Sequence, residues 1–232
     1  LVMPCCFDAW SARLVERADF PLSFMSGFAV AAARHALPDT GLVSYGEMVD
    51  AARAITAAVS IPVIGDGDTG YGNALNVRRT VAGYAAAGLA AVMIEDQVAP
   101  KRCGHTEGKQ VIPRAEALTR LRAAVDAREA GADILILART DARATDGLEE
   151  ALERARAFED LGADIIFVEA PRSEAEMEAI CRATTRPNLA NMIAGGASPV
   201  LPPTRLEELG FAIVAYPLAL LAVATRAMEG AL

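Results

Sequence analysis

The sequence predicts an α/β protein, and more specifically a single-domain (β/α)8 barrel, or TIM barrel, spanning residues 1–232. Short apolar runs rich in Ile and Val alternate along the chain with stretches of helical period, as they do in βα units. Some of these units repeat one order of residues: a helix end, a glycine, a small residue, an apolar run, and then polar or charged groups. The clearest copies lie at 85–97, 128–141 and 159–171, and a fainter copy lies at 207–217.

Eight strands are expected in this arrangement. They lie at 2–7, 21–25, 61–65, 90–95, 133–139, 164–169, 187–191 and 211–216. Consecutive rather than alternating apolar residues favour strands that are buried on both faces, which is typical of parallel sheets. Eight βα units in a chain of 232 residues match a closed barrel. A doubly wound open sheet is the alternative, because a local pattern does not show whether a sheet closes.

The stretches between the strands have the pattern of amphipathic helices. Leu118, Leu121 and Val125 fall on one helical face, behind Pro113 at a helix start. A serine followed by a glutamate three residues later predicts where two further helices begin, because the pair can form a capping box. These pairs are Ser44 with Glu47 and Ser173 with Glu176. The glycine of each repeated unit fits the left-handed position just after a helix.

Composition excludes some classes of function. A formal net charge of −8 argues against a nucleic-acid binder, which would need a basic surface. The most apolar tract, 211–225, is too short to span a membrane and contains Pro217, so no membrane association is expected. The four cysteines show no disulfide or CxxC spacing, which favours a cytoplasmic protein. The chain begins with Leu1, and we therefore expect its termini to be trimmed.

Polar residues stand at the ends of most of the predicted strands. In a barrel these ends share one rim, where the active sites of this fold lie. The residues are Ser26, Gly27, Asp66, Asp68, Glu95, Asp96, Arg139, Asp141, Glu169 and Asn191. We expect Asp96 and Asp141 only to cap the helices that follow them. The others are predicted to converge on one cavity.

The acidic loop GDGDTG, residues 65–70, has GxGxxG spacing between a strand and a helix. A dinucleotide site is nevertheless disfavoured, because two carboxylates would face a pyrophosphate. Asp66 and Asp68 are expected to point to the same side of an extended segment, and Glu95 adds a third carboxylate. Ligands that are all oxygen predict Mg²⁺, with Mn²⁺ as the alternative, at these three residues.

The stretch PKRCGHTEGK, residues 100–109, directly follows the fourth predicted strand and therefore belongs to the same rim. Its cations Lys101, Arg102 and His105 are placed to bind an anionic substrate above the acidic loop. They would also lower the pKa of the Cys103 thiol, for which we predict a role in the site. The other cysteines are expected to fill apolar space. They are Cys5, Cys6 and Cys181.

Motifs at these positions resemble those of the isocitrate lyase/phosphoenolpyruvate mutase superfamily over nearly the whole chain. The matching stretches are FDAWSARL (7–14), MSGFAVAA (25–32), LPDTG (37–41), GDGDTGYGNALNV (65–77), IEDQVAPKRCGH (94–105), LARTDA (137–142), FVEAP (167–171) and ANM (190–192). KRCGH beside IEDQ is typical of the lyases. The chain is most similar to the 2-alkylmalate and 2,3-dimethylmalate lyases and to carboxyvinyl-carboxyphosphonate phosphorylmutase-like proteins.

This resemblance implies a role for each predicted site residue. Asp66 would hold Mg²⁺, with Asp68, Glu95 and Asp39 acting through metal-bound water. Cys103 would protonate the departing carbanion, which the cations of its loop, Lys101 and His105, would stabilise. The base would be either a metal-held water or Asp39. The substrate-binding residues would be Ser26, Gly27, Gly104, Arg139, Glu169 and Asn191. Family members are homo-oligomers, dimers or more often tetramers that exchange a terminal helix.

The expected function is a Mg²⁺-dependent carbon–carbon lyase acting on a small di- or tricarboxylate. It would cleave a 2-hydroxy dicarboxylate, of the 2-alkylmalate or methylisocitrate type, to a 2-oxoacid and a carboxylate. Phe24, where isocitrate-type lyases tend to carry a Tyr, favours the alkylmalates. A carboxyphosphonoenolpyruvate-type phosphonomutase and an oxaloacetate decarboxylase are alternatives on the same scaffold. A non-catalytic dicarboxylate-binding barrel is the alternative from another class, and Ala194, where close relatives usually have a Glu, favours it.

Overall fold

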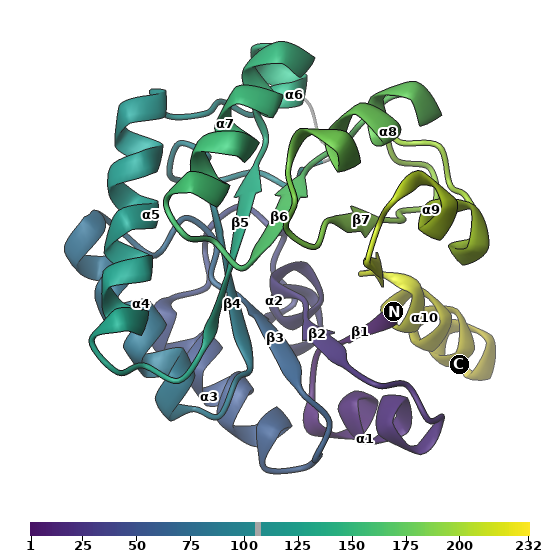
Figure 1. Ribbon diagram of the computed structural model, residues 1–232. Coiled ribbons are helices and arrows are strands. Elements are labelled where there is room, and N and C mark those ends of the chain that lie inside the picture. The colour runs from purple at the N-terminus through teal and green to yellow at the C-terminus, as the bar shows by residue number, and fades with distance from the viewer. Residues whose placement is uncertain (105–107) are drawn as a thin grey trace.

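The computed structural model describes residues 1–104 and 108–232, in which strands and helices alternate (Figure 1). The strands are β1 (Val2–Cys6), β2 (Ser23–Met25), β3 (Val63–Asp66), β4 (Ala91–Glu95), β5 (Leu135–Thr140), β6 (Ile165–Val168), β7 (Leu189–Asn191) and β8 (Ile213–Tyr216). The helices are α1 (Ala9–Arg17), α2 (Gly27–His35), α3 (Tyr45–Thr56), α4 (Ala74–Ala86), α5 (Arg114–Glu129), α6 (Ala142–Thr145), α7 (Leu148–Asp160), α8 (Glu174–Ala183), α9 (Pro203–Leu209) and α10 (Ala219–Ala231). Every predicted strand is present, with ends that differ by one or two residues.

The sheet is parallel throughout and forms a nearly closed barrel. Its strand order is β6-β5-β4-β3-β2-β1-β8-β7. The two end strands, β6 and β7, meet through a single bridge between Ile166 and Asn188, beside a 3.0 Å hydrogen bond from Ile166 N–H to the Pro187 carbonyl. Figure 1 shows helices such as α1, α4, α5 and α8 outside the ring of strands. The predicted (β/α)8 barrel is therefore confirmed over the doubly wound sheet.

The helix ends largely follow the sequence signals. Gly88, Gly162 and Gly210 have φ of +85°, +100° and +107°, the left-handed position that their repeated motif predicts. Ser44 and Glu47 form the predicted reciprocal capping box at the start of α3. The other predicted pair is only half formed. Ser173 accepts a bond from the Glu176 N–H at 3.2 Å, but the Glu176 carboxylate pairs with Arg143 and the Arg172 main chain instead.

Two apolar layers surround and fill the barrel. One layer packs between the sheet and the surrounding helices. The other fills the barrel interior with side chains such as Met3, Ile64, Leu137 and Phe167. The interior is therefore closed below the carboxyl ends of the strands, as in other barrels of this type. Buried Cys5 in β1 belongs to this interior layer, which confirms its predicted packing role.

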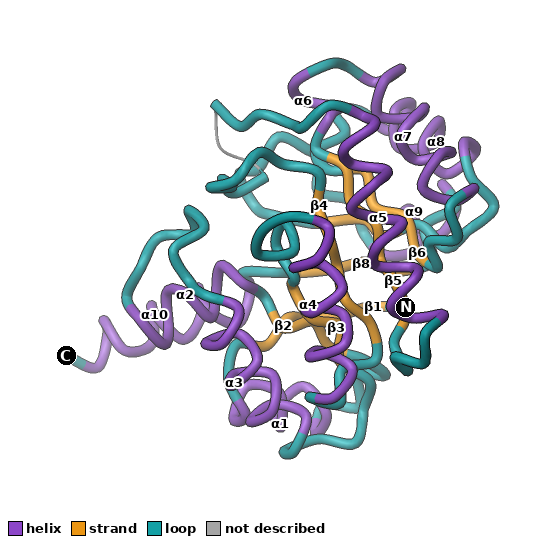
Figure 2. The backbone as a smooth tube through the Cα atoms, turned by 90° about the vertical axis from the view of Figure 1, so that its left-hand side faces the viewer, coloured by secondary structure: helices purple, strands orange, loops and turns teal. Residues whose placement is uncertain are grey.

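The last helix, α10, packs less closely than the others. It projects from the barrel toward the chain end in Figure 2, and none of its residues is buried. Val223 and Met228 are 68% and 59% exposed. No helix of the described chain is long and apolar enough to cross a bilayer.

Candidate active site

A cavity of about 70 Å³ lies at the carboxyl ends of the strands, on the rim that the sequence predicts. It gathers predicted residues from strand ends and from the loop after β4. They are Ser26, Asp39, Asp66, Lys101, Cys103, Gly104, Arg139, Glu169 and Asn191. Three further predicted residues contact this lining from behind. They are Gly27, Asp68 and Glu95. His105 lies outside the described residues. Apolar side chains complete the wall, among them Phe24, Phe28 and Phe167.

Asp66 ends β3, and main-chain groups hold its carboxylate. Its Oδ2 atom accepts a hydrogen bond from Gly27 N–H at 3.1 Å, and its Oδ1 atom accepts one from Asp68 N–H at 3.1 Å. Gly27 is the first residue of α2, so the positive end of that helix stabilises the anion. A Cβ atom at position 27 would lie 2.7 Å from the carboxylate. The glycine is thus needed for Asp66, and its contact with a substrate stays a prediction.

The acidic loop is turned, so the prediction of an extended segment is wrong. Asp68 has a φ of +46°, in the left-handed region, and Gly70 N–H donates to the Gly67 carbonyl at 2.8 Å. A left-handed non-glycine residue costs about 1 kcal/mol or more and persists where its surroundings hold it. The turn brings the Asp68 carboxylate to the ammonium group of Lys101.

Lys101 lies within a group of acids. Its Nζ atom hydrogen-bonds Asp39 and lies 3.0 Å from Asp68 Oδ1. Burial lowers the pKa of Lys101, but the charges of Asp68, Asp66, Glu95 and Asp39 outweigh that effect and raise it well above its usual value. Burial also raises the pKa of Asp68 to about 7, although the Lys101 charge opposes this. One ammonium group therefore does not balance the acids around it, and the group favours a further cation.

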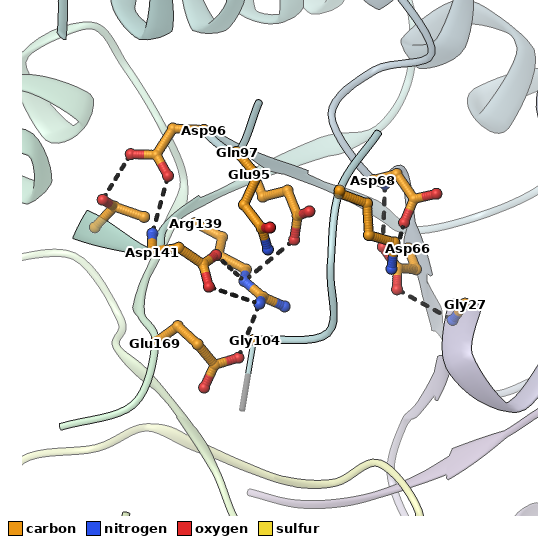
Figure 3. A network of polar contacts seen from close by, with 12 residues as sticks. Gly27, Asp66, Asp68, Glu95, Asp96, Gln97, Gly104, Arg139, Asp141 and Glu169 are labelled. Carbon is orange, nitrogen blue, oxygen red and sulfur yellow. Dashed lines mark hydrogen bonds and ion pairs between the residues drawn. The ribbon is translucent and has the colours of Figure 1, made fainter. Parts of the chain in front are cut away.

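Arg139 lies among three carboxylates (Figure 3). Its Nε and Nη2 atoms donate to the two oxygens of Asp141 at 2.8 and 3.1 Å. Nε also lies 3.3 Å from Glu95 Oε2, and Nη2 lies 3.1 Å from Glu169 Oε2. Figure 3 shows these residues as one group around the guanidinium, with the acidic loop and Gly27 as a second group. A substrate carboxylate that binds Arg139 would compete with acids already in place.

Glu95 connects the two groups of acids electrostatically. Burial raises its pKa well above the usual value, although the charge of Arg139 opposes the rise and Asp141 adds to it. Its Oε1 atom is buried and has no hydrogen-bond partner among the described residues. A buried carboxyl with an unpaired oxygen favours the uptake of a proton or the binding of a cation.

Asp96 and Asp141 do not cap the helices that follow them, so that prediction is wrong. Asp141 stands at the N-cap of α6 but makes no side-chain cap bond. Burial favours a higher pKa for Asp141, but Arg139 and Lys109 lower it to about 2, and Lys109 Nζ donates to it at 2.6 Å. Asp96 instead accepts bonds from Asp141 N–H at 2.9 Å and from Arg154 at 2.9 Å. Both acids hold charged partners in place.

Contacts at both ends hold the described part of the loop after β4. Gln97 Nε2 donates to the Arg102 carbonyl at 2.8 Å, and Arg102 N–H donates to Gln97 Oε1 at 3.0 Å. At the far end, Lys109 Nζ donates to the Gly104 carbonyl. Gly104 comes so close to Arg139 that a Cβ atom would lie 2.3 Å from Nη2. Cys103, the residue before Gly104, lines the cavity.

Asn191 supplies an unused acceptor to the cavity. Its Nδ2 atom lies 3.1 Å from Glu169 Oε2, which orients the amide. Its Oδ1 atom is buried and has no hydrogen-bond partner within residues 1–104 and 108–232. A hydroxyl group of a bound substrate would satisfy this oxygen, because a buried acceptor that stays unpaired costs free energy.

The acids fit a hard divalent cation that has few direct protein ligands. Glu95 Oε1 is a buried oxygen that lacks a hydrogen bond in the described part of the chain, and the only partner of Asp68 Oδ1 among these residues is the ammonium group of Lys101 at 3.0 Å. In that part, no three Asp, Glu, His or Cys side chains are arranged to coordinate one ion together. Mg²⁺ usually keeps several waters and binds through one or two carboxylates. The predicted metal-binding residues are compatible with that mode, and their assignment stays a prediction.

Some residues that support the site were not predicted. Lys109 ends the basic stretch 100–109, but only its pairing with Asp141 shows that it is buried rather than on the surface. Arg154 lies on α7, and Tyr84 on α4 donates its hydroxyl to the Asp66 carbonyl at 2.7 Å. A polar residue on a helix face gives no local signal of such a contact.

Known proteins match this chain along its whole length. A model of the phosphoenolpyruvate phosphomutase family matches residues 1–232. A 2,3-dimethylmalate lyase of Eubacterium barkeri is 46% identical over 228 residues, which cover 98% of this chain and 78% of that protein. A chloroplastic carboxyvinyl-carboxyphosphonate phosphorylmutase of Arabidopsis thaliana is 44% identical, with 98% of this chain and 68% of that protein covered. A crystal structure of 2,3-dimethylmalate lyase is similar with a TM-score of 0.96 at 40% identity, and covers 99% of this chain and 77% of its own.

Proposed function

The chain belongs to the phosphoenolpyruvate phosphomutase family, and we propose that it is a carbon–carbon lyase that cleaves a small 2-hydroxy dicarboxylate to a 2-oxoacid and a carboxylate. We further propose a branched 2-alkylmalate as the substrate, with methylisocitrate as the second choice. One observation carries the proposal most directly. A single cavity holds the Cys103 thiol, the Asp66 carboxylate and the Arg139 guanidinium. These groups are a proton donor, a cation ligand and a carboxylate partner.

Charge and shape of the wall support an alkyl-substituted diacid. Arg139 lies on one side with the unpaired oxygen of Asn191, and these groups suit a carboxylate and the hydroxyl group. Phe24 and Phe167 also line the cavity and favour an apolar substituent.

The chain's own groups account for the movement of protons. Asp39, in this proposal, takes the proton of the 2-hydroxyl group as the C2–O bond becomes a carbonyl. The electron pair of the C2–C3 bond passes to C3, and the Cys103 thiol gives its proton to that carbon. Lys101, together with His105 from outside the described residues, stabilises the negative charge that develops. A divalent cation, when bound, makes the hydroxyl more acidic and stabilises the 2-oxoacid.

Mg²⁺ is the proposed cofactor, with Mn²⁺ as a substitute. Asp66 would be the direct ligand, and Asp68, Glu95 and Asp39 would act through water. The cytoplasm is the proposed location, and a homo-oligomer, either a dimer or a tetramer, is the proposed assembly. Apolar residues exposed on α10, such as Val223 and Met228, support an assembly because contact with another subunit would bury them. Light scattering coupled to gel filtration measures the number of subunits.

A substrate panel tests the proposed reaction. The purified protein is assayed for 2-oxoacid release from 2-alkylmalates, methylisocitrate, oxaloacetate and phosphonopyruvate, with Mg²⁺ and then with excess EDTA. We expect release from an alkylmalate that EDTA abolishes and that added Mg²⁺ restores. Turnover of a phosphonate with no release from any malate would overturn the lyase assignment. Tight binding of a malate without turnover would instead support a dicarboxylate-binding barrel.

A further inference from the structure

We propose that Tyr84 is a positioning residue of the cation site, that it acts through the main-chain carbonyl of Asp66, and that Tyr71 acts through Tyr84. The inference rests on the proposed function, because it takes Asp66 as the residue that holds the divalent cation. Tyr84 lies on α4, behind the cavity, and is fully buried. Its hydroxyl donates to the Asp66 carbonyl at 2.7 Å.

The direction of the hydrogen bonds follows from the number of protons. A carbonyl oxygen can only accept a hydrogen bond, so the Tyr84 hydroxyl must donate its one proton to the Asp66 carbonyl. The Tyr71 hydroxyl lies 3.1 Å from the Tyr84 hydroxyl, and it must therefore be the donor of that pair. The bonds form a chain that runs one way, from Tyr71 through Tyr84 to the Asp66 carbonyl.

These hydrogen bonds from Tyr71 and Tyr84 reach Asp66, whose carboxylate is held separately by two main-chain N–H groups. Gly27 and Asp68 donate their N–H groups to the two carboxylate oxygens of Asp66, each at 3.1 Å. Tyr84 fixes the carbonyl of the same residue, so the peptide that follows cannot rotate freely. That peptide leads into a turn with two left-handed non-glycine residues, Asp68 at φ +46° and Tyr71 at φ +59°. Such conformations persist only where neighbouring groups hold them.

The aromatic rings pack independently of these hydroxyl groups. The Tyr45 ring stacks on Tyr84 with 6.4 Å between centroids and meets Tyr71 edge-on at 5.9 Å. The Arg79 guanidinium lies over the Tyr45 ring, 4.3 Å from its centroid. A Tyr→Phe change therefore keeps the packing and removes only a hydroxyl. Tyr45→Phe is a matched control, because its hydroxyl stands outside the chain of bonds to Asp66.

The test measures binding of MnCl₂ alone to the metal-free full chain, by calorimetry and by the electron paramagnetic resonance signal of free Mn²⁺. Tyr84→Phe is expected to raise the dissociation constant roughly 10-fold or more, the usual effect of losing a group that orients a ligand. Tyr71→Phe is expected to raise it less. The double variant should have the same dissociation constant as Tyr84→Phe, because without the Tyr84 oxygen the Tyr71 hydroxyl is no longer connected to the Asp66 carbonyl. Tyr45→Phe should bind as the wild type does.

A purely structural role would give a different result. If Tyr84 positions the site, saturating Mn²⁺ should restore the kcat of Tyr84→Phe to near the wild-type value while more metal is needed to reach it. Equal dissociation constants for wild type and Tyr84→Phe would overturn the inference alone. Equal weakening by Tyr45→Phe would overturn it too. If Tyr84→Phe does not fold, Tyr71→Phe is used instead, because Tyr71 is only half-buried. Its dissociation constant for Mn²⁺ is then compared with those of the wild type and Tyr45→Phe, and a value equal to the wild type's would overturn the inference. A wild-type chain that binds no Mn²⁺ would overturn the metal part of the proposed function as well.

Discussion

The ammonium group of Lys101 lies 3.0 Å from the Oδ1 atom of Asp68 and hydrogen-bonds Asp39. The loop after β4 therefore supplies a buried cation to these two acids, which lie in other loops. Lys101→Met keeps the length of the side chain and removes the charge. Breaking a buried ion pair costs about 3–5 kcal/mol, so the metal-free variant should unfold at a lower temperature. Added Mg²⁺ should restore part of the loss. A melting temperature equal to that of the wild type would contradict the pairing.

The Cys103 thiol is predicted to act as the general acid. Replacing it with alanine should lower kcat on the best malate by roughly 10²–10⁴-fold and change KM little, because binding does not depend on the proton. Cys181→Ala is the matched control, since Cys181 lies on α8 and outside the cavity. Steady-state kinetics on both variants decide the point, and similar effects at the two positions would argue against the assignment.

Asp141 is expected to make the free energy of unfolding decrease as the pH falls into the acid range. Its pKa falls from 3.8 to about 2 in the folded chain, because Arg139 and Lys109 outweigh the effect of burial. The ionised form is therefore favoured in the folded state, and its contribution, about 2 kcal/mol, is present above pH 4. It should be lost as the pH falls from about 4 to 2.

Asp141→Asn should remove this part of the pH dependence. Urea denaturation at several pH values below 5 measures the slope of unfolding free energy against pH. The variant is less stable at neutral pH, because Arg139 and Lys109 lose a partner, but its slope should be flatter than that of the wild type. An unchanged slope would show that other carboxylates govern acid unfolding.

Gly104 is predicted to tolerate no side chain where it lies in this structure. A Cβ atom would lie 2.3 Å from Arg139 Nη2 and 2.7 Å from Glu169 Oε2. Gly104→Ala should therefore push the loop away from Arg139 and lower kcat/KM by on the order of 10²-fold, because small misplacements of catalytic groups are costly. Gly230→Ala is the control, as a Cβ atom there meets nothing within 4 Å. A Gly104→Ala variant with wild-type kinetics would show that the loop can shift without loss.

The sequence predicted the fold well because its signals are local. The apolar runs marked every strand to within two residues, and the repeated glycine motif before four of them also predicted left-handed glycines after the preceding helices. Whether the sheet closes could not be predicted from local sequence patterns. Closure depends on β6 meeting β7 at Ile166 and Asn188, and no stretch of sequence encodes that contact by itself.

The site shows the same division between local and tertiary information. The polar strand ends and the stretch 100–109 indicated which rim would carry the chemistry, since the ends of parallel strands must share an edge. Partner choice was decided only in three dimensions. Asp141 was expected to cap a helix and instead pairs with Lys109, and the acidic loop was expected to be extended and instead turns at Asp68. Burial at one rim raises the cost of every unpaired charge, so each group takes the partner that the folded chain brings within reach, however distant in sequence.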